Sequence, residues 1–260
     1  MKWRLGVVGS PIEHSLSPQL HEAGLRQAGL KGSSVRVELP EADAKKLTKL
    51  MGKSYDALSV TMPLKRDALR YCHQLDDAAS RVGAVNSLLW RDEQIQGANV
   101  DGAGFLAALR AGFGVSVDNM HVVVLGSGGA ARAIIDALVS NGVSSVAVHA
   151  RSSDQVAELS SRYANVIGHM LVYRPVDLIV NTIPQSTRHH EAAVIQGVTP
   201  ETVAVDVTYA PAQSQWRTMY QAAGCRTQNG LGMLAYQAAL QMSWWFETPI
   251  EGAALLEVIS

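Results

Sequence analysis

The sequence predicts an α/β protein with two domains, and three observations lead to this prediction. Segments with strand and helix periodicity alternate along almost the whole chain. A glycine-rich turn, residues 126–129, stands between a β-branched apolar run and a segment with helical apolar spacing, which is the order that opens a dinucleotide-binding βαβ unit. The length of 260 residues allows two domains of modest size with a sizeable core.

Composition narrows the possible classes of partner. The hydrophobic fraction is 47%, the charged fraction 17% and the formal net charge −1, values typical of a soluble globular protein. This balance gives no reason to expect nucleic acid or a membrane as partner, and no stretch has the length of a membrane span. Cys72 and Cys225 are too few for a disulfide framework or a zinc site. We therefore expect a cytoplasmic protein without a structural metal.

In the first part of the chain, short apolar runs predict strands and longer amphipathic segments predict helices. The strands are expected at residues 4–9, 35–39, 55–60, 83–90 and 94–99, and the helices at 18–28, 41–51, 75–82 and 102–111. Ser17 before Pro18 suits an N-cap followed by proline at the first helical position. Ser15 is not needed for that cap, so the alternative is a cap whose two hydroxyls, at a strand end, also bind a polyol or a carboxylate. Both interpretations stay open.

Two charged residues stand at predicted helix starts. Pro63 suits the first turn of a helix, which places Lys65 in the same turn, where a cation opposes the helix macrodipole at a cost of about 0.3–1 kcal/mol. Such a position favours a functional lysine, although a solvated lysine is the ordinary alternative. Asp101 precedes the helix at 102–111, and a role as the N-cap of that helix would by itself explain its position.

In the second part the strand–helix alternation continues through the glycine turn. Strands are expected at residues 121–125, 144–149, 177–181 and 203–207, and helices at 130–139, 154–163, 214–223, 234–246 and 250–259. Glycines let the backbone turn tightly and approach a pyrophosphate at a helix N-terminus. Ala131 replaces the third glycine of the usual pattern, so an ordinary βα turn also remains possible.

Six motifs, in order, resemble the shikimate dehydrogenase family and its quinate-oxidising relatives. They cover nearly the whole chain, and their order and separations make the resemblance specific. The motifs occupy residues 9–18, 60–65, 83–86, 97–102, 126–131 and 229–237.

The resemblance implies the domain organisation and the substrate site. It implies an N-terminal α/β substrate-binding domain, residues 1–101, to which C-terminal helices, 229–260, return. A Rossmann-like NADP-binding domain, 102–228, lies between them in sequence. Lys65 and Asp101 correspond to the catalytic pair. Residues expected to bind the carboxylate of a small-molecule substrate are Ser15, Ser17 and Tyr209, and those expected to bind it through ring hydroxyls are Thr61, Asn86, Asp101 and Gln237.

The cofactor is expected to be NADP. The resemblance implies cofactor binding by the residues Gly126, Ser127, Gly128, Gly129, Ala130, Thr182, Gly230 and Met233. An NAD site usually has an acidic residue about 20 positions beyond the first glycine. Residues 143–153 contain no acid, and Arg151 lies where a 2′-phosphate would bind. NAD remains the alternative cofactor.

Three departures from the family pattern bear on the substrate and cofactor rather than on the chemistry. Ser59 stands where the family usually has asparagine, which removes an amide that supports the backbone or faces the substrate. Ala150 replaces another asparagine, and residues 181–186 lack a common glycine.

The family implies reversible, NADP-dependent reduction of 3-dehydroshikimate to shikimate. Quinate or combined quinate/shikimate oxidation with NAD(P) is the closest alternative. A non-catalytic dinucleotide-binding regulator is a third, although such a protein would need neither Lys65 nor Asp101. A monomer or a homodimer is expected.

Overall fold

A computed structural model describes residues 2–168, 175–184 and 196–260. The chain forms two units. The first contains Met1–Gly104 and Leu234–Ser260, and the second contains Phe105–Met233. Each unit has a six-stranded sheet with helices on its faces, so the predicted α/β fold class is confirmed.

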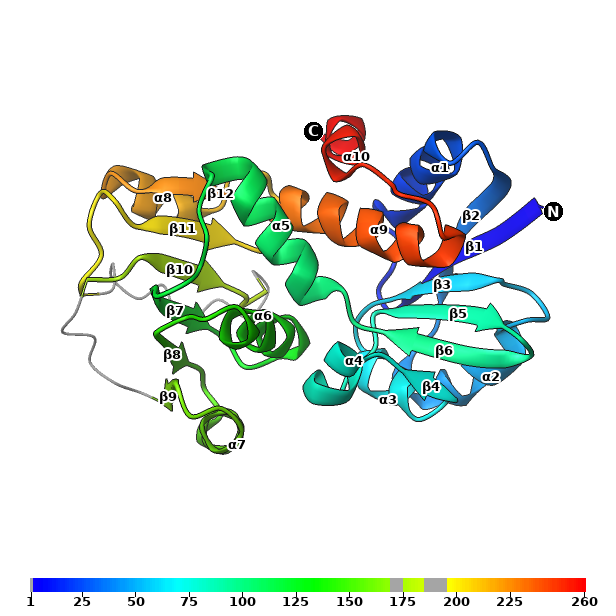
Figure 1. Cartoon of the computed structure of the whole chain (residues 1–260), viewed down its shortest axis with the longest axis horizontal. Helices are drawn as coiled ribbons and strands as arrows, with labels where there is room; N and C mark the ends of the chain where they lie inside the picture. Colours follow the sequence, from blue (N-terminus) through cyan, green and yellow to red (C-terminus); the bar gives the residue numbers. More distant parts are fainter. Residues whose placement is uncertain (1, 169–174, 185–195) are drawn as a thin grey trace. The chain divides into compact units, whose positions relative to one another are not determined.

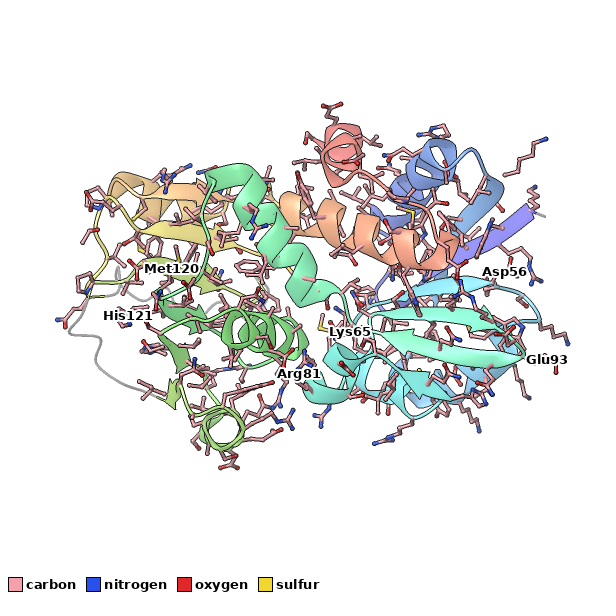
Figure 2. All side chains as sticks on the ribbon, viewed as in Figure 1. Asp56, Lys65, Arg81, Glu93, Met120 and His121 are labelled. Carbon is pink, nitrogen blue, oxygen red and sulfur yellow. The ribbon has the colours of Figure 1, made fainter. Side chains whose placement is uncertain are left out.

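The first unit is built on a mixed sheet with the order β2-β1-β3-β5-β6-β4. Its strands are β1 (Lys2–Gly9), β2 (Lys31–Glu38), β3 (Ala57–Val60), β4 (Gln74–Leu75), β5 (Ser87–Arg91) and β6 (Gln94–Ala98). Its helices are α1 (Ser17–Gln27), η1 (Glu41–Lys46), α2 (Leu47–Leu50), α3 (Lys65–Leu69), α4 (Asp77–Val82) and α10 (Gly252–Ile259). It also contains the start of α5 (Asp101–Phe113) and most of α9 (Leu231–Phe246). The β5–β6 hairpin turns at Asp92 and Glu93, which both have positive φ, and Glu93 marks its tip in Figure 2.

Strand alternation divides the core of the first unit between two faces of this sheet. Ala57 and Leu89 belong to a cluster with α1, α9 and α10, whereas Leu58 and Leu88 belong to a second cluster with α2, α3 and α4. Figure 1 shows these two groups of helices on opposite sides of the strands. The central strand β3 and the first three residues of β5 are therefore buried on both faces of the sheet.

The second unit has an all-parallel sheet with the order β12-β11-β10-β7-β8-β9. Its strands are β7 (His121–Leu125), β8 (Ser145–His149), β9 (Val166–Gly168), β10 (Leu178–Asn181), β11 (Val203–Asp206) and β12 (Arg226–Gln228). Among the described residues of this unit, the helices are α6 (Gly129–Ser140), α7 (Ser153–Arg162) and α8 (Gln215–Ala222), with most of α5. The chain order reverses between β7 and β10, and ligands of open α/β sheets bind beyond the strand ends at such a switch point.

Two predicted helices differ from the structure, and two short strands were not predicted. The segment predicted as one helix at 41–51 is the 3₁₀ helix η1 followed by the four-residue α2. Leu75 pairs with Gly97 in β4 and does not begin a helix. The strands β9 and β12 were not predicted, because three-residue edge strands carry too little periodicity to be seen and depend on pairing with β8 and β11.

Candidate active site

Lys65 and Asp101 form an ion pair within the first unit. Lys65 is the first residue of α3, where Figure 2 labels it, and Asp101 is the first residue of α5. The Nζ of Lys65 donates to Oδ2 of Asp101 at 2.6 Å. The side chains are 22% and 7% exposed, so this is a largely desolvated pair in which the lysine keeps access to solvent. Pro63 lies just before α3 and not in its first turn, because Leu64 is the N-cap.

Asn86 binds the other carboxylate oxygen of this pair, and Gln237 is bound to Asn86. The β5–β6 hairpin places Asn86 immediately before β5 and Asp101 three residues after β6, and the Asn86 N–H donates to the carbonyl of Ala98 at 3.0 Å. Asn86 Nδ2 donates to Asp101 Oδ1 at 2.8 Å and to Gln237 Oε1 at 3.3 Å. The carboxylate thus has a cation on one oxygen and an amide on the other, with lone pairs left to accept a ligand hydroxyl.

Ser15 and Ser17 lie near each other at the start of α1. Ser15 Oγ donates to Ser17 Oγ at 3.2 Å and accepts from the Ser17 N–H at 3.3 Å. The prediction that Ser17 is the N-cap was wrong: Leu16 is the N-cap, and no side chain makes the cap hydrogen bond. Helix capping therefore does not account for either hydroxyl.

Thr61 belongs to the loop after β3, next to the loop after β1 that leads to the serines. The Thr61 N–H donates to the carbonyl of Val8 at 2.9 Å, and the Ser10 N–H donates to the carbonyl of Met62 at 2.9 Å. A Cβ at Gly9 would overlap the methyl group of Thr61, so the close approach of these loops requires glycine. Parallel pairing of β1 with β3 brings the two loops to the same sheet edge.

The glycine turn of the second unit lies at the switch point of its sheet. Gly126 has a φ of +109°, and a Cβ there would collide with the hydroxyl of Thr182. Thr182 follows β10, and its Oγ1 donates to the carbonyl of Leu125 at 2.7 Å. Gly128 is the N-cap of α6, with open space where its Cβ would be, whereas Ala131 is fully buried in the core. An N-terminus of a twelve-residue helix with open space before it fits a diphosphate.

The remaining residues of this turn take part in the packing around it. Gly129 and Ala130 are the first two residues of α6. Ser127 Oγ donates to Gln155 Oε1 at 2.6 Å. Arg132 is bound to Glu158 through two hydrogen bonds of 2.8 Å, so its guanidinium is already paired.

Arg151 follows β8 and precedes Ser152, the N-cap of α7. Its side chain is exposed, and it makes no ion pair with any residue that the structure describes. The Gly126 N–H donates to the carbonyl of His149 at 2.8 Å, which ties the glycine turn to the strand end before Arg151. An exposed guanidinium beside a glycine turn that fits a diphosphate is suited to a further phosphate group.

Gly230, Met233 and Tyr209 belong to the same unit. A Cβ at Gly230 would overlap the carbonyl of Val207, and the Gly230 N–H donates to the carbonyl of Thr208 at 3.0 Å. Met233 packs against the core of the unit. Tyr209 is half-buried in the loop after β11, and burial raises its pKa.

Asp206 is a functional candidate that the sequence analysis missed. It is 1% exposed and accepts from the N–H of Thr208 at 3.0 Å, its hydroxyl at 2.8 Å and the hydroxyl of Ser214 at 2.6 Å. These bonds fix the loop that carries Tyr209. An acid directly after the apolar run 203–205 was the available signal.

Within the described residues, no helix is long and apolar enough to cross a membrane. The same part of the chain contains no group of three or more His, Cys, Asp or Glu side chains arranged to hold a metal ion. Cys72 and Cys225 are both free thiols. Residues 185 and 186, part of the stretch that lacks the common glycine, lie outside the described residues.

The fold and these residues define a two-unit α/β protein whose parallel sheet carries a glycine turn at its switch point. A model of the shikimate dehydrogenase substrate binding domain matches residues 7–88. Shikimate dehydrogenase (NADP(+)) of Jannaschia sp. (strain CCS1) is 36% identical to this chain over an alignment 268 residues long. The alignment covers 98% of this chain and 96% of the relative. The chain therefore belongs to the shikimate dehydrogenase family.

Solved structures show the same fold. Shikimate 5-dehydrogenase of Thermus thermophilus, in complex with NADP(H) and shikimate, is 31% identical with a TM-score of 0.89, and 98% of each chain is covered. The ligand-free form of 5-ketofructose reductase of Gluconobacter sp. strain CHM43 has a TM-score of 0.87 at 24% identity, over 100% of this chain and 98% of that one. The second likeness concerns the fold alone, so the fold by itself does not choose the substrate.

Proposed function

We propose that this protein is an NADP-dependent shikimate dehydrogenase that reversibly reduces 3-dehydroshikimate to shikimate. The observation that carries the proposal is the Lys65–Asp101 ion pair of 2.6 Å with Asn86 on the second carboxylate oxygen. Support comes from the lysine ammonium held beside a carboxylate and an amide, in a chain whose relatives are named shikimate dehydrogenase (NADP(+)).

Lys65 is the general acid and base of the proposed reaction. NADP(H), when bound, supplies hydride transfer. In the direction of reduction, Lys65 Nζ gives a proton to the carbonyl oxygen as that oxygen becomes a hydroxyl, and in oxidation Nζ takes the proton back. Asp101 holds the ammonium through Oδ2 and can accept a substrate hydroxyl through its remaining lone pairs. Asp101 is thus a partner of the lysine and a substrate ligand.

The remaining substrate contacts are proposed as follows. Ser15 and Ser17 bind the carboxylate through neutral donors, with Tyr209 as a third, and Thr61, Asn86 and Gln237 bind ring hydroxyls. Support comes from the serine hydroxyls, which do not cap α1, and from the hydrogen bonds that join Asn86 to Asp101 and to Gln237. In this proposal residues 1–101 and 229–260 form the substrate-binding domain.

The cofactor is proposed to lie on the second unit, with residues 102–228 as its domain. Backbone groups at Gly126–Ala130 and the N-terminus of α6 bind the diphosphate, and Arg151 binds the 2′-phosphate of NADP. Thr182, Gly230 and Met233 complete the cofactor contacts. Support comes from the open space at Gly128 and from the exposed Arg151, which pairs with no acid among the described residues.

A four-way assay tests the function. The purified protein is supplied with shikimate or quinate, each with NADP⁺ or NAD⁺, and the appearance of reduced cofactor is followed. Shikimate with NADP⁺ should give the highest kcat/KM. A higher kcat/KM for quinate would identify a quinate dehydrogenase, and no turnover in any combination would identify a non-catalytic binder. Light scattering after gel filtration would distinguish a monomer from a homodimer, and fractionation of cells would test the cytoplasmic location.

A further inference from the structure

A continuous line of hydrogen bonds crosses the interior of the first unit, through side chains that the proposed reaction does not use. His21 on α1 is fully buried, and Ser59 on β3 and Gln241 on α9 are buried with it. His21 Nδ1 lies 2.7 Å from the hydroxyl of Ser34, and Nε2 lies 2.9 Å from that of Ser59. Ser59 Oγ donates to Gln241 Oε1 at 2.6 Å. Gln241 Nε2 donates to the carbonyl of Asn86 at 3.1 Å.

The carbonyl of Asn86 fixes the direction of every bond in this line. A carbonyl only accepts, so the amide nitrogen of Gln241 must face it and the amide oxygen must face Ser59. The Ser59 hydroxyl therefore donates its one proton to Gln241 Oε1 and accepts a hydrogen bond from His21 Nε2–H. Burial lowers the pKa of His21 to about 3, although Gln241 acts in the opposite direction, so the ring is neutral. Its Nδ1 then accepts from Ser34.

The line ends on the residue that holds the catalytic carboxylate. The carbonyl of Asn86 accepts from two donors, Gln241 Nε2 at 3.1 Å and the N–H of Val60 at 2.8 Å. The side chain of the same residue donates to Asp101 Oδ1 at 2.8 Å and accepts from the N–H of Val100 at 2.9 Å. The backbone carbonyl of Asn86 is thus fixed by Gln241 and Val60, and its side chain is fixed by Asp101 and Val100.

We propose that Ser59 is a positioning residue, which with His21 and Gln241 fixes Asn86 and so holds Asp101 against Lys65. Ser59 stands where the family pattern expects asparagine, and in this chain the hydroxyl of the serine is linked to Asn86 through the side chain of Gln241. This inference rests on the proposed function, because the pair that it positions is the proposed catalytic pair.

Ser87 provides a matched control. It is the direct cross-strand neighbour of Ser59, it is fully buried, and its hydroxyl also meets α9. Its hydroxyl accepts from Trp245 Nε1 at 2.9 Å and takes no part in the line to Asn86. Ser87→Ala therefore removes a buried hydroxyl from the neighbouring position in the sheet and leaves the hydrogen bonds from His21 to Asn86 intact.

The experiment compares Ser59→Ala with Ser87→Ala, each made in the parent and in a Lys65→Ala background, with kcat, KM and Tm measured. Ser59→Ala should lower kcat for shikimate about tenfold in the parent, the effect of one buried hydrogen bond, and leave KM for NADP unchanged. In the Lys65→Ala background its effect should be less than twofold, because there is no lysine left to position. Ser87→Ala should lower Tm comparably and leave kcat within twofold of the parent.

Two results would overturn the inference alone. One is a folded Ser59→Ala enzyme with kcat within twofold of an active parent, and the other is the same tenfold loss in both backgrounds, which would indicate general distortion. Gln241→Met breaks the line at its next member and tests the same point if Ser59→Ala does not fold. It should lower kcat as Ser59→Ala does, and the double variant should be no worse than the more impaired single variant. A parent that is inactive with shikimate would overturn the proposed function and this inference together.

Discussion

Protonation of His21 on acidification should destabilise the fold by a predictable amount. The imidazole is fully buried and both ring nitrogens meet hydroxyl groups, and burial lowers its pKa to about 3. In the unfolded chain its pKa is about 6.5. Since the folded value is the lower one, the unfolded state binds the proton first as the pH falls. The neutral ring therefore contributes its full stability above about pH 6.5, and this contribution is lost on going toward pH 3.

The magnitude follows from the two pKa values. Below pH 6.5 the free energy of unfolding should fall by about 1.4 kcal/mol per pH unit from this residue alone, or about 2 kcal/mol between pH 7 and pH 5. Urea unfolding at pH 7, 6 and 5 measures it, with His21→Asn as the variant that cannot titrate. The parent should lose about 2 kcal/mol more than the variant over this interval. Parallel curves for the parent and His21→Asn would refute the reasoning, since they would mean that His21 takes up its proton in the folded state.

The remaining predictions concern the proposed site. Lys65→Ala should lower kcat about 10²–10⁴-fold with little change in KM for NADP, and Asp101→Asn should also lower kcat substantially. A folded Lys65→Ala enzyme whose kcat is within threefold of the parent would contradict the mechanism. Ser15→Ala and Ser17→Ala should each lower kcat/KM for shikimate by roughly tenfold or more. Because neither hydroxyl caps α1, neither variant should lower Tm through the loss of a helix cap, and Tm is measured beside the kinetics to check this. An unchanged kcat/KM for shikimate would mean that the carboxylate binds elsewhere. Arg151→Ala should raise KM for NADP far more than KM for NAD, whereas equal effects would remove the case for a 2′-phosphate contact.

Local patterns in the sequence were enough to predict the main elements and the glycine turn. Residues 122–124 are three consecutive valines, and such a run is typical of a strand buried on both faces, as β7 is. Gly126 and the apolar spacing after it identify a turn into a helix, because both signals lie within a few residues. Lys65 also stood out locally, since it is a cation at a helix start. Where stability depends on pairing with a distant strand, as in β12, the local signal was insufficient.

Only the tertiary structure decided which polar groups meet. Asp101 lies 36 positions from Lys65, and the two come together because the β5–β6 hairpin sets the register between Asn86 and Ala98. Capping by Ser17 was a reasonable local prediction, yet α1 begins at Ser17 itself, and the Ser17 hydroxyl makes no cap hydrogen bond. The bond from Ser59 to Gln241 spans 182 positions. Its physical reason is burial: once packing of α1, β3 and α9 excludes water, each enclosed polar group must find a partner inside the protein, and no local pattern specifies that partner.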